Sequence, residues 1–128
     1  MAFYYISDLH LCHRSIARRR GFPSVQEHDR TLLENLGRRG GPNDTIFLLG
    51  DLFAYDCDEL LLEEMEGLGQ YIVLIQGNHE ARHWLHKASP ALLSRVFADI
   101  REEAEITDGD RIVRMCHQPR PDLYDEDE

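Results

Sequence analysis

The sequence predicts an α/β fold, because short apolar runs typical of strands alternate with helical patterns along most of the chain. Three runs rich in aromatic and β-branched residues are expected to be buried strands: Ala2–Ile6, Thr45–Leu49 and Tyr71–Ile75. Polar residues follow each run directly. In such a fold the functional loops gather at the carboxyl ends of the strands, so we expect a site there.

Three segments are expected to be helices. Ser24-Val25-Gln26-Glu27 has the Ser-x-x-Glu form of a capping box, and the apolar stripe that follows it stops at Gly37. A second helix is expected over Asp58–Leu68, and a third around Ala88–Phe97. Each of the first two connects one predicted strand to the next.

The end of the sequence has a different pattern. Ala104–Thr107 and Arg111–Met115 are two short apolar runs joined by Asp108-Gly109-Asp110, which is typical of a hairpin turn, and the second run leads into Cys116-His117. No internal repeat, low-complexity linker or change in composition interrupts the chain. We therefore expect a single domain over residues 1–128, with an acidic tail at about 121–128.

Composition indicates an ordinary globular protein. The 128 residues are 42% hydrophobic and 30% charged, and no run of about eighteen apolar residues could span a bilayer. The start of the chain leads straight into a polar motif, unlike a signal peptide. The cysteines number three and show no Cys-x-x-Cys spacing, which favours reduced thiols and a cytoplasmic location.

The formal net charge of -10 argues against broad binding to nucleic acid, because such binding depends on cations that neutralise phosphates. It does not exclude a phosphorylated substrate held by metal ions. We expect no membrane partner.

Candidate metal ligands follow each of the three predicted strands. The segments are Asp8-Leu9-His10, Gly50-Asp51 and Gly77-Asn78-His79-Glu80, and His117 follows the hairpin. Carboxylate, amide and imidazole donors suit divalent cations of the first transition row. A pair of such cations needs a bridging carboxylate and a nearby proton donor, and this set contains both.

Each of these residues also has a purely structural interpretation. Asp8 and Asn78 could cap turns, Asp51 could cap a helix, and His117 could be a hydrogen-bonded histidine at a strand end. Independent capping does not require this combination of residue types. The joint pattern therefore favours a two-metal centre.

Taken in order, these motifs resemble those of the calcineurin-like metallophosphoesterases over about residues 2–118. The Asp8-x-His10-x-x-His13 opening and the helix over Ser24–Leu36 are similar to the small bacterial and phage branch of that family. The resemblance implies an α/β sandwich of two β-sheets flanked by helices. It also implies hydrolysis of a phosphate mono- or diester by a hydroxide that bridges two metal ions, without a phosphoenzyme.

The resemblance assigns the metal ligands residue by residue. Asp8 and His10 would hold the first ion, Asp51 would bridge the two ions, and Asn78 with His117 would hold the second. The cofactors implied are two divalent metal ions, with manganese expected first and iron or zinc as alternatives.

The resemblance also implies roles around the phosphate ester. His79, as an imidazolium, would protonate the departing alkoxide, and Asp51 would take part in catalysis through the metal bridge. Arg14 and Arg18 follow the first motif and could hold a substrate phosphate. His13 could reach the first metal ion or a substrate phosphate, with a surface or supporting position as the alternative. For the arginines, a solvated helix face is the alternative.

The sequence departs from the family pattern after His117. The family's Gly-His-x-His motif is absent from the remaining residues, Gln118–Glu128, so metal affinity should be lower. One interpretation is a C-terminally truncated fragment of an ordinary enzyme. The other is a non-catalytic metal-binding or interaction module on the same fold. Loss of the distal strands would also expose a sheet edge that a homo-oligomer could cover.

Two other histidine patterns have simpler interpretations. His79-Glu80-Ala81-Arg82-His83 matches the His-Glu-x-x-His signature of zinc peptidases, but that signature requires a helix, and here Gly77-Asn78 precedes it at a strand exit. His28, on the first predicted helix, is expected to be an exposed or packed side chain without a role in the site.

Overall fold

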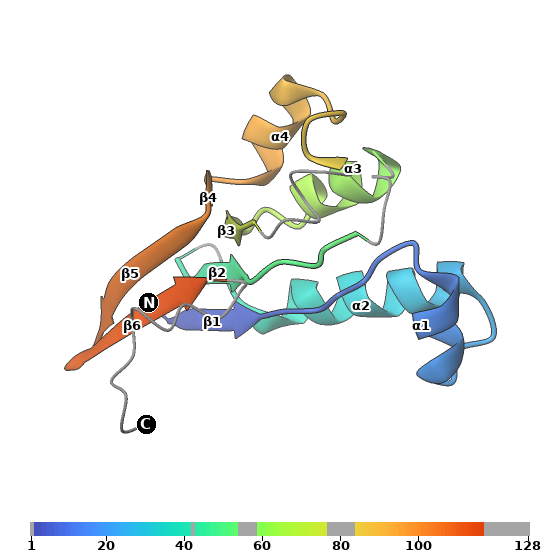
Figure 1. The fold of residues 1–128 in the computed structure, drawn as a ribbon, viewed down its shortest axis with the longest axis horizontal. Helices are drawn as coiled ribbons and strands as arrows, with labels where there is room; N and C mark the ends of the chain where they lie inside the picture. The colour runs from blue at the N-terminus through green and yellow to red at the C-terminus, as the bar shows by residue number, and fades with distance from the viewer. Residues whose placement is uncertain (1, 42, 54–58, 77–83, 117–128) are drawn as a thin grey trace.

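The computed structural model describes residues 2–41, 43–53, 59–76 and 84–116 (Figure 1). These ranges contain four helices and six strands. In chain order they are β1 Phe3–Ile6, α1 Arg14–Arg19, α2 Val25–Arg39, β2 Thr45–Leu48, α3 Glu59–Gly67, β3 Tyr71–Ile75, α4 Pro90–Val96, β4 Asp99–Arg101, β5 Glu103–Asp108 and β6 Arg111–Cys116. No helix in this part of the chain is long and apolar enough to cross a membrane.

The main sheet is parallel and has the strand order β1-β2-β3-β4. Because the strands follow one another in space as they do in sequence, every right-handed crossover places its helix on the same face. The remaining strands, β5 and β6, pair antiparallel as a hairpin. This arrangement confirms the predicted α/β fold with two sheets.

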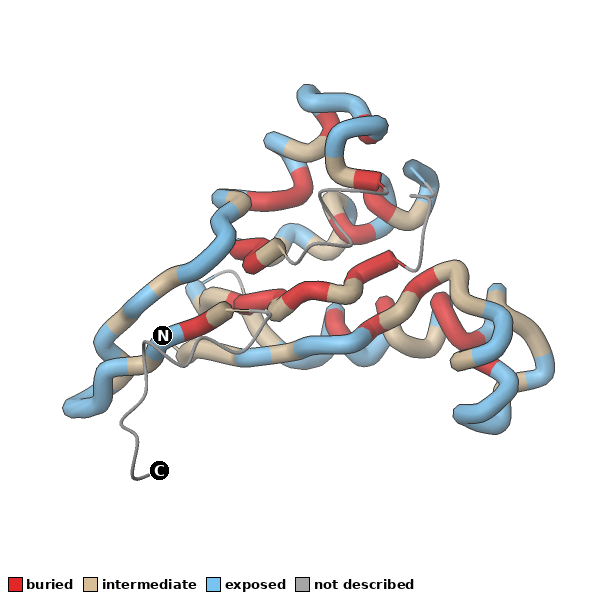
Figure 2. The backbone as a smooth tube through the Cα atoms, viewed as in Figure 1, coloured by how far each residue is buried: buried red, intermediate tan, exposed pale blue. Residues whose placement is uncertain are grey.

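Alternate residues of the main sheet serve two separate cores. Ile46 and Leu48 of β2 and Ile72 and Leu74 of β3 contribute to the larger core, which α2, α3 and α4 cover. The residues that alternate with them in the strands point to the opposite side, where they pack with Met115 of β6 in a smaller core. These residues are Phe47, Val73 and Ile75. We call the two sides the helix face and the hairpin face. Figure 2 shows that buried segments concentrate in the strands and on the inner sides of the helices.

The helix face is closed by large apolar side chains. The helices contribute Leu33, Leu36, Leu62, Met65, Leu92 and Val96. Trp84 is fully buried there, and its ring meets that of Phe53 edge to face with 5.0 Å between centroids. Trp84 is therefore a central part of the helix-face core.

Three local features differ from the expectations. The helix expected to stop at Gly37 continues to Arg39. Gly37 lies inside it, where a Cβ would be 3.0 Å from Leu68 Cδ2, so the glycine allows close packing there. β4 was not expected, since three residues are too few to show a pattern. Residues 14–19 form a short helix that His13 caps.

Candidate metal centre

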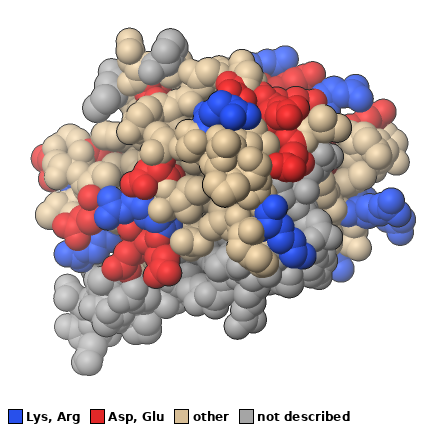
Figure 3. Space-filling view, turned by 90° about the horizontal axis from the view of Figure 1, so that it is seen from above, with Lys and Arg blue, Asp and Glu red and all other residues tan. Residues whose placement is uncertain are grey.

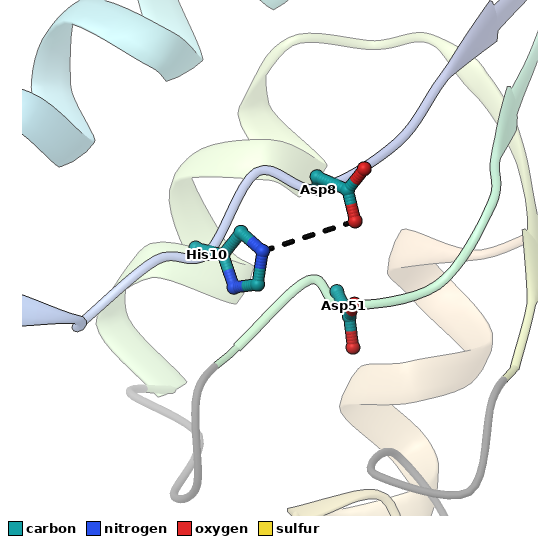
Figure 4. Close-up of side chains that lie close together, drawn as sticks. All are labelled: Asp8, His10 and Asp51. Atoms are coloured by element: carbon teal, nitrogen blue, oxygen red, sulfur yellow. Dashed lines mark ion pairs between the residues drawn. The ribbon is translucent and has the colours of Figure 1, made fainter. Parts of the chain in front are cut away.

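The candidate site lies where the loops after β1 and β2 continue side by side beyond the sheet (Figure 4). The amide of His10 donates to the carbonyl of Asp51 at 2.9 Å, and the amide of Leu11 donates to the carbonyl of Leu52 at 2.8 Å. Leu11 also forms a parallel bridge with Phe53. These bonds extend the β1–β2 pairing into the loops, so the two candidate ligand segments are fixed relative to each other.

Asp8, His10 and Asp51 converge at this point. One ligand atom from each lies within 4.8 Å of the other two. His10 Nε2 and Asp8 Oδ1 are 3.8 Å apart. Two donors that share one cation at about 2.1 Å each lie at most about 4.2 Å apart, so small side-chain rotations bring all three onto one ion. Two carboxylates and an imidazole are a donor set that fits a divalent transition metal.

The backbone at the site is unusual. Asp8, His10, Cys12 and Asp51 have φ values of 59°, 51°, 65° and 52°, all in the left-handed region. Non-glycine residues rarely adopt this conformation, which costs about 1 to 3 kcal/mol per residue and is concentrated at functional sites. The candidate ligands therefore occupy strained positions that the surrounding structure must stabilise.

The environment of His10 favours its neutral form. Burial lowers the pKa of His10 below its ordinary value of 6.5 and outweighs the opposing effect of the Asp51 and Asp8 carboxylates. Arg20 and His13 lower this pKa further. A neutral imidazole has the lone pair that a metal ion needs, so the metal-binding form of His10 is present at neutral pH.

His13 lies beside this site at the start of α1, and the two arginines lie within that helix. His13 caps the helix, because its Nδ1 accepts the amide hydrogen of Ile16 at 3.2 Å, and its ring centroid is 5.9 Å from that of His10. Arg14 and Arg18 are exposed and line a cavity of about 300 Å³ with Phe22 and neighbouring residues. The structure thus places His13 near a candidate ligand, and it places the arginines on the exposed face of α1, around a hollow that none of the candidate ligands in the described part of the chain lines.

The remaining predicted site residues lie outside the described part of the chain. They are Asn78 and His117, expected on the second metal ion, and His79, expected as the proton donor. The His79–His83 segment and the acidic tail at about 121–128 also lie outside it. Their roles stay predictions.

Three residues were not expected to support the loop after β1 that carries Asp8 and His10, the first ligand loop. Arg20 and Asp29 contact it directly, and His28 connects the two. The sequence carries one signal that could have indicated two of them. His28 and Asp29 are polar residues that interrupt the apolar face of the first predicted helix, and in the structure both are buried.

Comparison with known proteins decides the family. The model of the calcineurin-like phosphoesterases matches residues 1–119. This chain belongs to the calcineurin-like phosphoesterase family. The resemblance inferred from the sequence motifs is confirmed at this level, and with it a metal-binding type of site.

Two similar proteins are described only as uncharacterized or of unknown function. An uncharacterized protein of Methanocaldococcus jannaschii, MJ1445, is 35% identical over 80 residues, which cover 60% of this chain and 46% of that protein. A protein of unknown function from Aquifex aeolicus, AQ665, has a similar structure with a TM-score of 0.69 and 24% identity, covering 93% of this chain and 62% of that one. The chain thus spans less than two thirds of either relative.

Proposed function

We propose that this chain is a metal-dependent phosphoesterase that hydrolyses a phosphate mono- or diester. The observation that supports this most is the convergence of Asp8, His10 and Asp51 at adjacent strand ends, in a member of the calcineurin-like phosphoesterase family. Bound divalent ions would supply Lewis-acid activation of water and of the phosphoryl oxygens. Manganese is the ion we propose first.

The residues of the chain would divide the work around the ester. Asp8 and His10 would hold one ion and Asp51 would bridge to a second, for which Asn78 and His117 are the proposed ligands. His79 is proposed to deliver a proton to the leaving oxygen. This division uses each residue for the chemistry that its side chain provides.

The substrate phosphate would lie against the α1 side of the site. Arg14 and Arg18 of α1 would supply guanidinium groups that can each bind two phosphate oxygens. We propose a small phosphate ester as partner. Figure 3 shows basic side chains scattered among acidic and uncharged ones on the face it views, which does not favour broad binding of a polyanion there.

The test is turnover of a chromogenic phosphodiester and a phosphomonoester with added Mn²⁺, compared with Asp51→Asn. We expect wild-type turnover that EDTA abolishes. Asp51→Asn should lower kcat/KM by about 100-fold or more, because loss of metal stabilisation adds several kcal/mol to the activation barrier and each 1.36 kcal/mol added slows the reaction about tenfold. Asp110→Asn, an exposed carboxylate in the hairpin turn, is the matched control and should keep full activity.

Two outcomes would contradict the proposal. Wild-type protein without turnover at millimolar Mn²⁺ would favour a non-catalytic metal-binding or interaction module on the same fold. Turnover that Asp51→Asn leaves unchanged would show that the assigned residues are not the active site.

A further inference from the structure

Three polar side chains outside the ligand set form a hydrogen-bonded group against the first ligand loop. Arg20 follows α1, and His28 and Asp29 lie one turn into α2. His28 is fully buried and Asp29 is 5% exposed, an unusual environment for both residue types. Buried polar groups of this kind are stable only when their hydrogen bonds are satisfied.

Arg20 donates two hydrogen bonds to the backbone of the first ligand loop, next to the candidate ligands. Its Nη2 donates to the carbonyl of Asp8 at 2.9 Å, and its Nη1 donates to the carbonyl of Leu9 at 3.1 Å. The same Nη1 lies 2.8 Å from His28 Nε2. Both hydrogen bonds from Arg20 to the loop go to backbone oxygens, so Arg20 does not occupy the carboxylate of Asp8.

The direction of each remaining hydrogen bond follows from Arg20. Since a guanidinium only donates, His28 Nε2 must accept, and the ring hydrogen resides on Nδ1. His28 Nδ1 then donates to Asp29 Oδ1 at 2.8 Å. The other oxygen, Asp29 Oδ2, accepts the amide hydrogen of Cys12 at 3.0 Å. The chain of bonds therefore starts at Asp8 and returns to the loop at Cys12.

These contacts lie on both sides of His10, where the loop is strained. Asp8, His10 and Cys12 are the left-handed residues of this segment, and the bonds reach the first and the last of them. We propose that Arg20, His28 and Asp29 are positioning residues that hold Asp8 and His10 in the geometry that binds the first metal ion. This inference rests on the metal centre of the proposed function.

Charge and positioning make opposite predictions for Arg20. A cation beside a metal site repels the metal, so removal of its charge alone would tighten metal binding. If Arg20 instead fixes the loop, its removal weakens binding although a positive charge has gone. The sign of the change therefore identifies the mechanism.

The first experiment measures Mn²⁺ affinity by titration calorimetry for the wild type, Arg20→Met and Arg20→Lys. We expect the Kd to rise about 10- to 100-fold in Arg20→Met, the range found when groups that orient metal ligands are removed. Arg20→Lys keeps the charge but loses the planar fork that reaches two carbonyls, so it should not restore the affinity. Arg19→Met, an exposed neighbour on α1, is the control and should bind as the wild type does.

The second experiment reads the loop directly, without metal. Asp29→Asn keeps the size of the side chain but replaces one acceptor with a donor, so it cannot accept from both His28 and Cys12. We expect faster amide hydrogen exchange at Cys12 by NMR in the EDTA-treated protein, together with a higher Mn²⁺ Kd. Glu34→Gln, an exposed change on the same helix, should alter neither.

The outcomes separate this inference from the proposed function. If the wild type binds Mn²⁺ and Arg20→Met binds it equally or more tightly, the positioning role is wrong while the metal centre stands. Unchanged exchange at Cys12 in Asp29→Asn would overturn it too. A wild type that binds no Mn²⁺ would contradict both the inference and the proposed function.

Discussion

The two faces of the main sheet are covered very differently. The helix face is closed by three helices over a continuous core that includes Trp84. The hairpin face is covered by two strands, and Tyr5 and Tyr71 remain 38% and 54% exposed. Both faces belong to the same four strands, so the difference shows that most of the apolar burial in the described residues comes from one side.

The candidate metal centre depends on the helix face. Along the first ligand loop the side chains alternate: Leu9 and Leu11 are buried in the helix-face core, while Asp8 and His10 are more exposed. Leu52 and Phe53 anchor the second loop in the same core. Both ligand loops are therefore held in place by packing against the helix-face core and not by the hairpin.

The largest expected effect tests this asymmetry within β3. Ile72 and Ile75 are the same residue type and both fully buried, but Ile72 packs on the helix face and Ile75 on the hairpin face. Truncation to alanine costs about 2 to 5 kcal/mol, and less where the surroundings collapse into the cavity. We expect about 4 kcal/mol for Ile72→Ala and about 2 kcal/mol for Ile75→Ala, because a two-stranded cover relaxes more easily.

Urea unfolding measures both free energies. The two variants should show the same m-value as the wild type, so that the midpoint alone reports stability. Equal losses, or a larger loss for Ile75→Ala, would mean that the hairpin packs as rigidly as the helices do.

A smaller effect concerns the link between the hairpin and the main sheet. The hydroxyl of Tyr5 donates to Asp108 Oδ2 at 2.9 Å, and this contact is solvent-exposed. We expect Tyr5→Phe to lower the free energy of unfolding by about 0.5 kcal/mol, the low end for a single hydrogen bond. Tyr71→Phe makes the same chemical change on the same face and should have less effect. If the two variants were indistinguishable by urea unfolding, the Tyr5–Asp108 bond would contribute nothing.

The smallest expected effect concerns His10, which lies beyond the carboxyl ends of the strands and on neither face of the sheet. Since burial lowers the pKa of His10 in the folded protein, the unfolded chain binds a proton there more readily. The resulting loss of stability is absent well above 6.5 and grows as the pH falls through that value. In metal-free protein, wild-type stability should therefore fall more than that of His10→Gln between about pH 7.5 and 5.5. Parallel pH profiles would contradict the assigned environment of His10.

The sequence predicted the parts of the molecule that repeat a local pattern. The strands, the long helix and the hairpin follow from short-range periodicity, and the convergence of Asp8, His10 and Asp51 follows from their places behind parallel strands. β4 was not predicted, because a strand of three residues is too short to show an alternating pattern of apolar and polar residues.

The support of the first ligand loop could not be predicted in the same way. In the sequence nothing distinguishes Arg20 from the arginines beside it, and His28 was expected to have no role in the site. Their contacts depend on how α1 and α2 pack beside the loop, with Arg20 against the loop carbonyls and Asp29 against the Cys12 amide. Such contacts arise from tertiary packing, and no spacing in the sequence encodes them.

The adjacency of β1 and β2 has a consequence for the order in which the molecule assembles. Asp8, His10 and Asp51 all precede residue 54, and the pairing that aligns their loops joins consecutive strands. Contacts of modest sequence separation form with less loss of chain entropy than distant ones. During synthesis, these three donors can therefore come together before the hairpin has left the ribosome.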